Sequence, residues 1–174
     1  MDGHPSEPDG FRDFVQARSS ALLRSGWLLT GDWPSAEDLV QTALAAAWPR
    51  WTTLTRQDAP ELYVRKIMVN TFLRWRQRRW NGEIATGRLP ELQAYGDVFA
   101  QIDARQALIA ALDRLPARQR AVVVLRYFAD QTEAQTAAAM GCSVGAVKAH
   151  ASKALARLRG APGLAELMTG GVAS

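Results

Sequence analysis

The chain has 174 residues, of which 48% are hydrophobic and 22% are charged. This composition is typical of a folded protein with one ordinary domain or two small ones, and it excludes a disordered chain. No segment approaches the ~18 continuous apolar residues of a membrane span, and no basic and apolar signal segment opens the sequence. The single cysteine, Cys142, cannot form an internal disulfide. We therefore expect a cytoplasmic protein without membrane insertion.

Charge is unevenly distributed, although the formal net charge is only +4. The balance is +5 in residues 56–80, −3 in residues 81–103 and +6 in residues 104–160. Two basic segments separated by an acidic one favour a polyanionic partner that is contacted at two places.

Apolar residues recur at helical spacing, and the alternation typical of strands is nearly absent, which predicts an all-α fold. The first helix is expected over residues 11–30 and should end at Gly31. Asp32 as an N-cap and Pro34 in the first turn predict a second helix that runs to Trp48.

The second helix has one apolar and one polar face. Leu39 and Ala43 fall at helical spacing and should pack inward, whereas Asp38 and Gln41 should point outward. A third helix is expected from Pro60 toward Arg79.

Glycine and proline interrupt residues 81–103, which we expect to form a flexible, extended acidic linker with room for one short helical piece. The linker would join two small helical domains, residues 11–80 and 104–160. Within the second domain the sequence predicts helices over residues 104–115, 116–128, 132–140 and 143–159.

Residues 132–150 fit a helix-turn-helix, a motif that can place its second helix in the major groove of DNA. Gly141 can adopt the positive φ of the turn, and Ser143 is a suitable N-cap. The inner stripe of the second helix should consist of Val144, Val147, Ala151, Leu155 and Leu158. The opposite face carries the small and basic residues that we expect to lie against DNA: Ser143, Gly145, Ala146, Lys148, Ala149, Ser152, Lys153 and Arg157.

Two packed helices with a glycine turn also occur in proteins that never bind DNA. Here no acidic residue lies between Cys142 and Gly160, and the surrounding segment has a charge of +6, so we favour nucleic acid.

Residues 63–80 interleave arginines with aromatic residues. Cations that bind phosphates beside rings that stack on bases suit an unpaired strand. Each tryptophan taken alone is better explained as part of a core, so the prediction depends on the density of both residue types.

Enzyme chemistry finds little support in the sequence. His4 and His150 are far apart and have no cysteine or carboxylate cluster near them, and no glycine-rich phosphate loop is present. We expect no catalytic residue, no metal and no cofactor.

Three segments, in this order, resemble an extracytoplasmic-function (ECF) sigma factor, the two-domain promoter-specificity subunit of bacterial RNA polymerase. Residues 32–43 resemble region 2.2, which binds the polymerase clamp. Residues 59–79 are similar to regions 2.3 and 2.4, which open and read the −10 element. Residues 115–128 and the helix-turn-helix resemble region 4, which docks on the polymerase flap and reads the −35 element. The Trp-Arg-Gln-Arg-Arg-Trp and Leu-Arg-Tyr-Phe segments resemble the sigma-E-like subgroup.

The resemblance implies that core RNA polymerase and promoter DNA are partners, and it makes an anti-sigma factor a candidate partner. Asp38 and Gln41 would contact the polymerase, and the face of residues 143–157 would bind the −35 element. The −10 element would be bound by Asn70 and Trp75 at its bases and by Arg76, Arg78 and Arg79 at its backbone. The acidic linker would act inside basic channels of the polymerase.

The sequence departs from the family pattern at two places. Arg74 stands where ECF factors often carry an aspartate, and Gly145-Ala-Val-Lys-Ala replaces the usual Gly-Thr-Val-Lys-Ser, which removes two hydroxyls able to bond phosphate or base edges.

The main alternative is a stand-alone helix-turn-helix regulator that binds a palindromic operator as a dimer. It would leave the segment 63–80 and the helix of Asp38 and Gln41 without a role. The sequence therefore favours a sigma factor that directs promoter-specific initiation.

Overall fold

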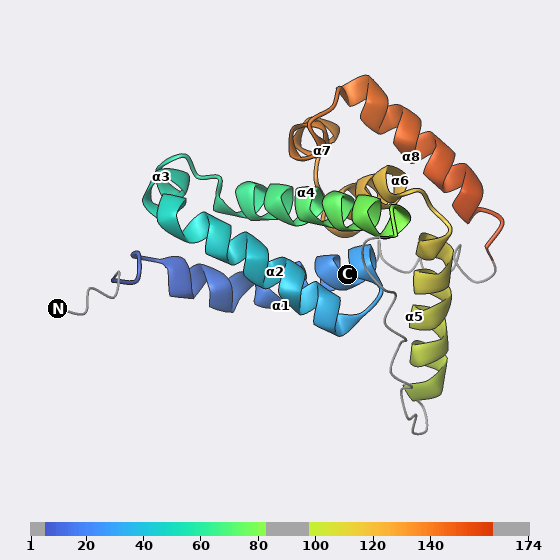
Figure 1. Ribbon diagram of the computed structural model, residues 1–174, viewed down its shortest axis with the longest axis horizontal. Helices are drawn as coiled ribbons and strands as arrows, with labels where there is room; N and C mark the ends of the chain where they lie inside the picture. The colour runs from blue at the N-terminus through green and yellow to red at the C-terminus, as the bar shows by residue number, and fades with distance from the viewer. Residues whose placement is uncertain (1–5, 83–97, 162–174) are drawn as a thin grey trace.

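The computed structural model describes residues 6–82 and 98–161, and the regular elements in these ranges are all helical (Figure 1). The predicted all-α fold is therefore confirmed. The first half holds α1 (Phe11–Thr30), α2 (Trp33–Ala47), α3 (Trp51–Arg56) and α4 (Pro60–Trp80). The second half holds α5 (Val98–Asp113), α6 (Ala117–Val123), α7 (Glu133–Met140) and α8 (Val144–Leu158). A 3-10 turn, η1 (Trp48–Arg50), follows α2, and a π-helical turn, η2 (Val124–Phe128), continues α6.

The turn between α1 and α2 is fixed by two neighbouring residues. Gly31 ends α1 with φ 86°, and its N–H donates to the Trp27 carbonyl oxygen over 2.7 Å. Asp32 then accepts a hydrogen bond from the Ser35 N–H over 2.8 Å and begins α2. The predicted boundary between these two helices is confirmed, because glycine is the residue that tolerates this backbone conformation and aspartate is a preferred N-cap.

The core of the first half lies between α1, α2 and α4, which pack on one another. Its most deeply buried side chains include Leu22, Leu39, Met68 and Phe72. The sequence did not predict α3. This short helix forms because the chain continues helically past Pro49 and buries Trp51, whose Nε1 donates to the Asp9 carbonyl oxygen over 3.0 Å.

In the second half, α8 packs on α6 and α7. Gly141 ends α7 with φ 63°, and Ser143 accepts a hydrogen bond from the Ala146 N–H over 3.1 Å at the start of α8. Both predicted turn residues of the helix-turn-helix are confirmed. The expected inner stripe is wrong at Val144, which is 39% exposed because it stands in the first turn, outside the contact with α7, whereas Val147 is buried.

Helix α5 begins at Val98, so the last residues of the expected linker, 98–103, are helical rather than extended. No glycine or proline separates Val98 from Asp113, and a helix that is nucleated further along can therefore extend backward. Most of the remaining linker, residues 83–97, lies outside the described residues, as do three of the four acidic positions of the linker.

The two halves pack against each other. Helix α4 lies against α6 and α7 (Figure 1), and α1 contacts η2. The buried apolar residues of both halves therefore form one continuous cluster. The sequence predicted two domains but gave no sign of this contact. None of the described helices is long and apolar enough to cross a membrane.

Candidate nucleic-acid interface

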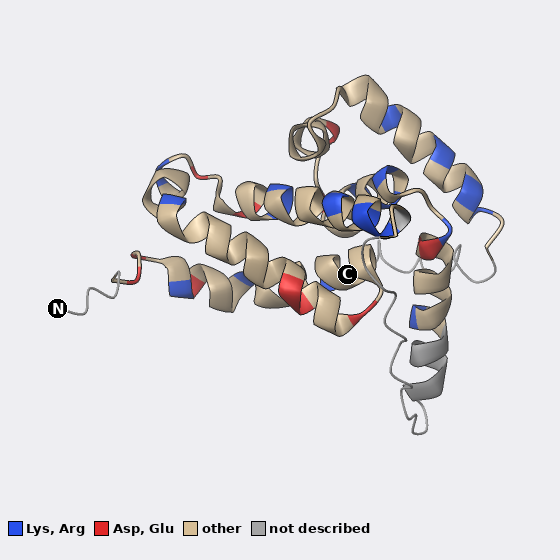
Figure 2. Ribbon diagram, in the orientation of Figure 1, with Lys and Arg blue, Asp and Glu red and all other residues tan. Residues whose placement is uncertain are grey.

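Helix α8 presents the small and basic face that the sequence predicted. Ala154 and Val147 are fully buried and fix the rotation of the helix, since both point into the core. The predicted DNA-facing residues lie together on the other side of the helix, and Figure 2 shows the positions of its cations along α8. Ala146 is half-buried, and the exposed members are Ser143, Gly145, Lys148, Ala149, Ser152, Lys153 and Arg157.

Glu133 is a carboxylate beside this face that the sequence analysis did not single out. Its Oε2 lies 3.7 Å from Nζ of Lys148, and its Oε1 lies 4.0 Å from Nη2 of Arg126. Glu133 and Lys148 are too far apart in sequence for helical spacing to pair them. The structure brings them together because α7 and α8 fold back on each other at Gly141.

Helix α4 presents the second group of predicted site residues. Arg78 and Arg79 are exposed, whereas Asn70, Trp75 and Arg76 are half-buried. Trp75 packs partly against the core, and the Arg76 guanidinium carbon lies 5.9 Å from the centre of the Phe72 ring. One face of α4 therefore packs into the core, while the C-terminal end of the helix carries solvent-exposed cations.

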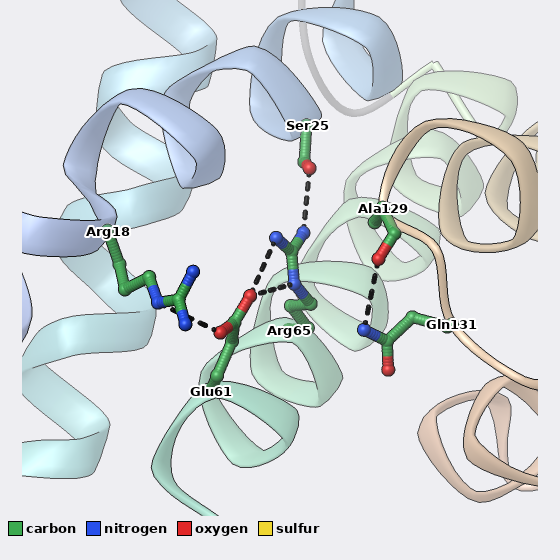
Figure 3. Close-up of polar contacts among 6 residues, drawn as sticks. All are labelled: Arg18, Ser25, Glu61, Arg65, Ala129 and Gln131. Carbon is green, nitrogen blue, oxygen red and sulfur yellow. Dashed lines mark hydrogen bonds and ion pairs between the residues drawn. The ribbon is translucent and has the colours of Figure 1, made fainter. Parts of the chain in front are cut away.

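Arg65 belongs to the same basic segment but is occupied within the protein (Figure 3). Its Nη1 donates to Ser25 Oγ over 2.7 Å, and its Nε and Nη2 donate to Glu61 Oε1 over 3.1 and 3.0 Å. Glu61 Oε2 is also 3.2 Å from Nε of Arg18. Since only 5% of its side chain is exposed, Arg65 joins α4 to α1 and is not available to a phosphate.

Figure 3 also shows the loop before the helix-turn-helix, where Gln131 Nε2 donates to the Ala129 carbonyl oxygen over 3.2 Å. Arg126 also binds the backbone of this loop, because its Nη1 donates to the Gln131 carbonyl oxygen over 2.6 Å. These bonds hold the entry to α7 in place.

A cleft of about 1020 Å³ separates the C-terminal half of α4 from residues 114–118 and Met140. Asn70 and Arg76 line one wall, and Arg114 and Arg118 line the other. In this arrangement two of the predicted −10 residues face the second half of the molecule. The cleft is basic because the described residues that line it include four arginines and no carboxylate.

Helix α2 is oriented as the sequence predicted. Leu39 and Ala43 are fully buried, whereas Asp38 and Gln41 are exposed. Beside Gln41 a groove of about 440 Å³ runs between α1 and α2 and is lined mostly by apolar side chains. This surface can accept a partner that combines a polar contact with an apolar one.

Two protein-family models match the chain: "Sigma-70 region 2" over residues 14–82 and "Sigma-70, region 4" over residues 105–158. The RNA polymerase sigma-E factor of Streptomyces coelicolor is 41% identical over 149 residues, which are 86% of this chain and 84% of the relative. The ECF RNA polymerase sigma factor SigL of Mycobacterium tuberculosis is 29% identical over 153 residues, 85% of this chain and 86% of the relative.

Two solved structures share the fold. The sigma factor RpoE in complex with the anti-sigma factor NepR from Bartonella quintana gives a TM-score of 0.69 at 24% identity, covering 87% of this chain and 96% of that one. CnrH in complex with the cytosolic domain of CnrY gives a TM-score of 0.60 at 21% identity, covering 86% and 84%.

Proposed function

Because the chain belongs to the family of ECF RNA polymerase sigma factors, we propose a division of work between its two halves. The protein acts in promoter-directed transcription, and its partners are RNA polymerase and promoter DNA. Residues 11–80 bind the polymerase and the −10 element, residues 104–160 bind the −35 element, and residues 81–103 connect them.

The observation that carries this division is the face of α8. It joins small side chains, which permit close approach to base edges, with Lys148, Lys153 and Arg157, which suit phosphates. The described part of α8 contains no acidic residue. We assign the three cations to contacts with DNA phosphates. The contacts with DNA base edges are assigned to Ser143, Gly145, Ala146, Ala149 and Ser152.

The −10 element is assigned to α4. Trp75 supplies a ring for stacking and Asn70 an amide that can donate and accept, whereas Arg76, Arg78 and Arg79 suit the backbone of an unpaired strand. Asn70 and Arg76 line the cleft between the halves, so a strand that reaches both has to enter this cleft.

The polymerase is assigned to the outer face of α2. Asp38 and Gln41 are held outward by a helix whose other face is fully buried at Leu39 and Ala43. A carboxylate and an amide on a rigid helix can fix the orientation of a partner by directed polar contacts.

Sigma factors are transcription initiation factors, and we propose that this chain has no catalytic activity of its own. We place it in the cytoplasm, where its polymerase and DNA would be found. The solved complex of RpoE with the anti-sigma factor NepR supports a partner of the anti-sigma type for this chain as well.

Mobility-shift experiments with core polymerase present or absent test the assignment. The DNA would be a pool of fragments from the source genome. We expect a defined subset of fragments to shift only when the polymerase and this protein are both present. Retention of palindromic fragments by the protein alone would favour the stand-alone regulator instead.

A further inference from the structure

Glu133 stands beside a cation that the proposed function gives to a DNA phosphate. Its carboxylate lies 3.7 Å from Lys148 on one side and 4.0 Å from Arg126 on the other. Lys148 belongs to the proposed −35 face of α8, whereas Arg126 lies in η2. The carboxylate therefore occupies a position next to which a phosphate would have to bind.

The backbone fixes where Glu133 stands. It is the first residue of α7, and Thr132 and Gln135 form a capping box around it. Thr132 Oγ1 accepts from the Gln135 N–H over 3.0 Å, and Gln135 Oε1 accepts from the Thr132 N–H over 2.9 Å. On the opposite side of the pair, the buried Val147 fixes the turn of α8 that carries Lys148. The two charges are thus brought together by the fold of the helix-turn-helix.

The ion pair contributes little to folding. The side chains of Glu133 and Lys148 are 39% and 64% exposed, and pairs with this exposure are weak because water screens them. The contact can open at small cost, so its main consequence concerns what else Lys148 can bind.

We propose that Glu133 limits the affinity of α8 for DNA by competing with phosphate for Lys148, an inference that rests on the proposed −35 function. A phosphate on Lys148 would bring a second negative charge close to the carboxylate, and like charges repel. Because phosphate contacts carry no direct sequence information, this limit weakens binding by a similar factor on every sequence. Glu133 sets the strength of binding without changing which sequence is preferred.

Holoenzyme assembled from core polymerase and the full chain is the material for the test. Its dissociation constant is measured at several salt concentrations on two labelled duplexes, one with a promoter active in run-off transcription and one with its −35 element scrambled. We expect Glu133→Gln to tighten binding to both duplexes by about twofold to fivefold, the size of an exposed ion pair. The salt dependence should steepen toward one additional phosphate contact, a slope change of at most about 0.9.

Two further variants distinguish the Glu133–Lys148 ion pair from the general effect of removing one negative charge near the DNA. Asp130→Asn removes a carboxylate near Glu133 that is exposed and forms no ion pair with the described residues, and asparagine tolerates its φ of 52°. We expect this variant to bind DNA as the wild type does. In a Lys148→Ala background, Glu133→Gln should no longer tighten binding, because the competing cation is absent.

Five results would overturn the inference. Glu133→Gln could weaken binding, which would mean that the carboxylate holds Lys148 ready for phosphate. Glu133→Gln could tighten binding equally in the Lys148→Ala background, or Asp130→Asn could tighten binding as much as Glu133→Gln does. Either result would mean that the effect comes from the net charge of the domain and not from the ion pair. If wild-type holoenzyme binds the intact and the scrambled duplex with the same affinity, the −35 assignment itself fails and the inference fails with it. If wild-type holoenzyme prefers the intact −35 element but Glu133→Gln leaves both dissociation constants unchanged, the inference alone is overturned.

Discussion

Arg120 of α6 donates a hydrogen bond from Nε to the carbonyl oxygen of Leu28 in α1 over 2.7 Å, and this bond joins the two halves of the molecule. The Arg120 side chain is fully buried, and its Nη1 also donates to Asp113 Oδ1 over 2.5 Å, while its Nη2 has no hydrogen-bond partner among residues 6–82 and 98–161. Burial lowers the pKa of Arg120, and the bond to Asp113 opposes that shift. The cost of burying this cation offsets much of what its hydrogen bonds contribute to the contact between the halves.

Replacing Arg120 should distinguish its volume from its charge. Arg120→Ala leaves a cavity and an unpaired Leu28 carbonyl, so we expect the free energy of unfolding to fall by about 2–4 kcal/mol. Arg120→Met also leaves the Leu28 carbonyl unpaired, but it fills most of the space and removes a poorly solvated charge, so we expect a smaller loss of about 1–2 kcal/mol. Urea unfolding measures both. Equal losses in the two variants would show that the hydrogen bonds, and not the packing, stabilise this contact.

Glu61 forms one ion pair with the buried Arg65 and another with the exposed Arg18, so the two pairs should contribute differently to the free energy of unfolding. Glu61→Gln removes the charge that faces Arg65, whose side chain is nearly buried, and we expect a loss of about 2 kcal/mol. Arg18→Gln breaks the outer pair, in which the arginine is 53% exposed, and should cost less than about 1 kcal/mol. Thermal unfolding of both variants tests this order, and a larger loss for Arg18→Gln would contradict it.

Charge reversal at Asp38 tests the polymerase face. Asp38→Lys should weaken binding to core polymerase by about tenfold, as expected for a directed charged contact, and leave the circular dichroism spectrum unchanged. Glu37→Lys is the matched control, since Glu37 is exposed on the same helix but points about 100° away. If both variants bind polymerase as the wild type does, Asp38 has no role at this surface.

Substitution of Trp75 tests the −10 assignment. Stacking is worth about 1–3 kcal/mol per base, so Trp75→Ala should slow open-complex formation by about tenfold or more on duplex promoters. A pre-melted template should recover most of the loss, and Trp75→Phe, which keeps a ring, should behave closer to the wild type. Permanganate footprinting reports the opened bases. A variant with full activity on both templates would place Trp75 in the core alone.

Much of the fold could be predicted from local signals. Gly31 and Asp32 mark the turn between α1 and α2, and Gly141 and Ser143 mark the turn of the helix-turn-helix, because caps and positive φ angles depend on few neighbouring residues. Short α3 escaped prediction because its stability comes from burying Trp51.

The missing parts of the candidate site depend on tertiary contacts. Arg65 reads as one more basic residue in the sequence, yet its bond to Ser25 removes it from the interface. Glu133 and Lys148 meet only when α7 and α8 fold together, and Arg120 reaches Leu28 across 92 positions of sequence. No periodicity or charge count can reveal such pairs.

Run-off transcription tests the central claim most directly. Core RNA polymerase from the source organism is incubated with genomic promoter fragments, with and without the full chain, and the transcripts are sequenced from their 5′ ends. The sigma-factor function predicts discrete transcripts that appear only when the chain is present and whose start sites share upstream −35 and −10 sequences. Transcripts that are identical with and without the chain, when the chain is folded and bound to the polymerase, would contradict it.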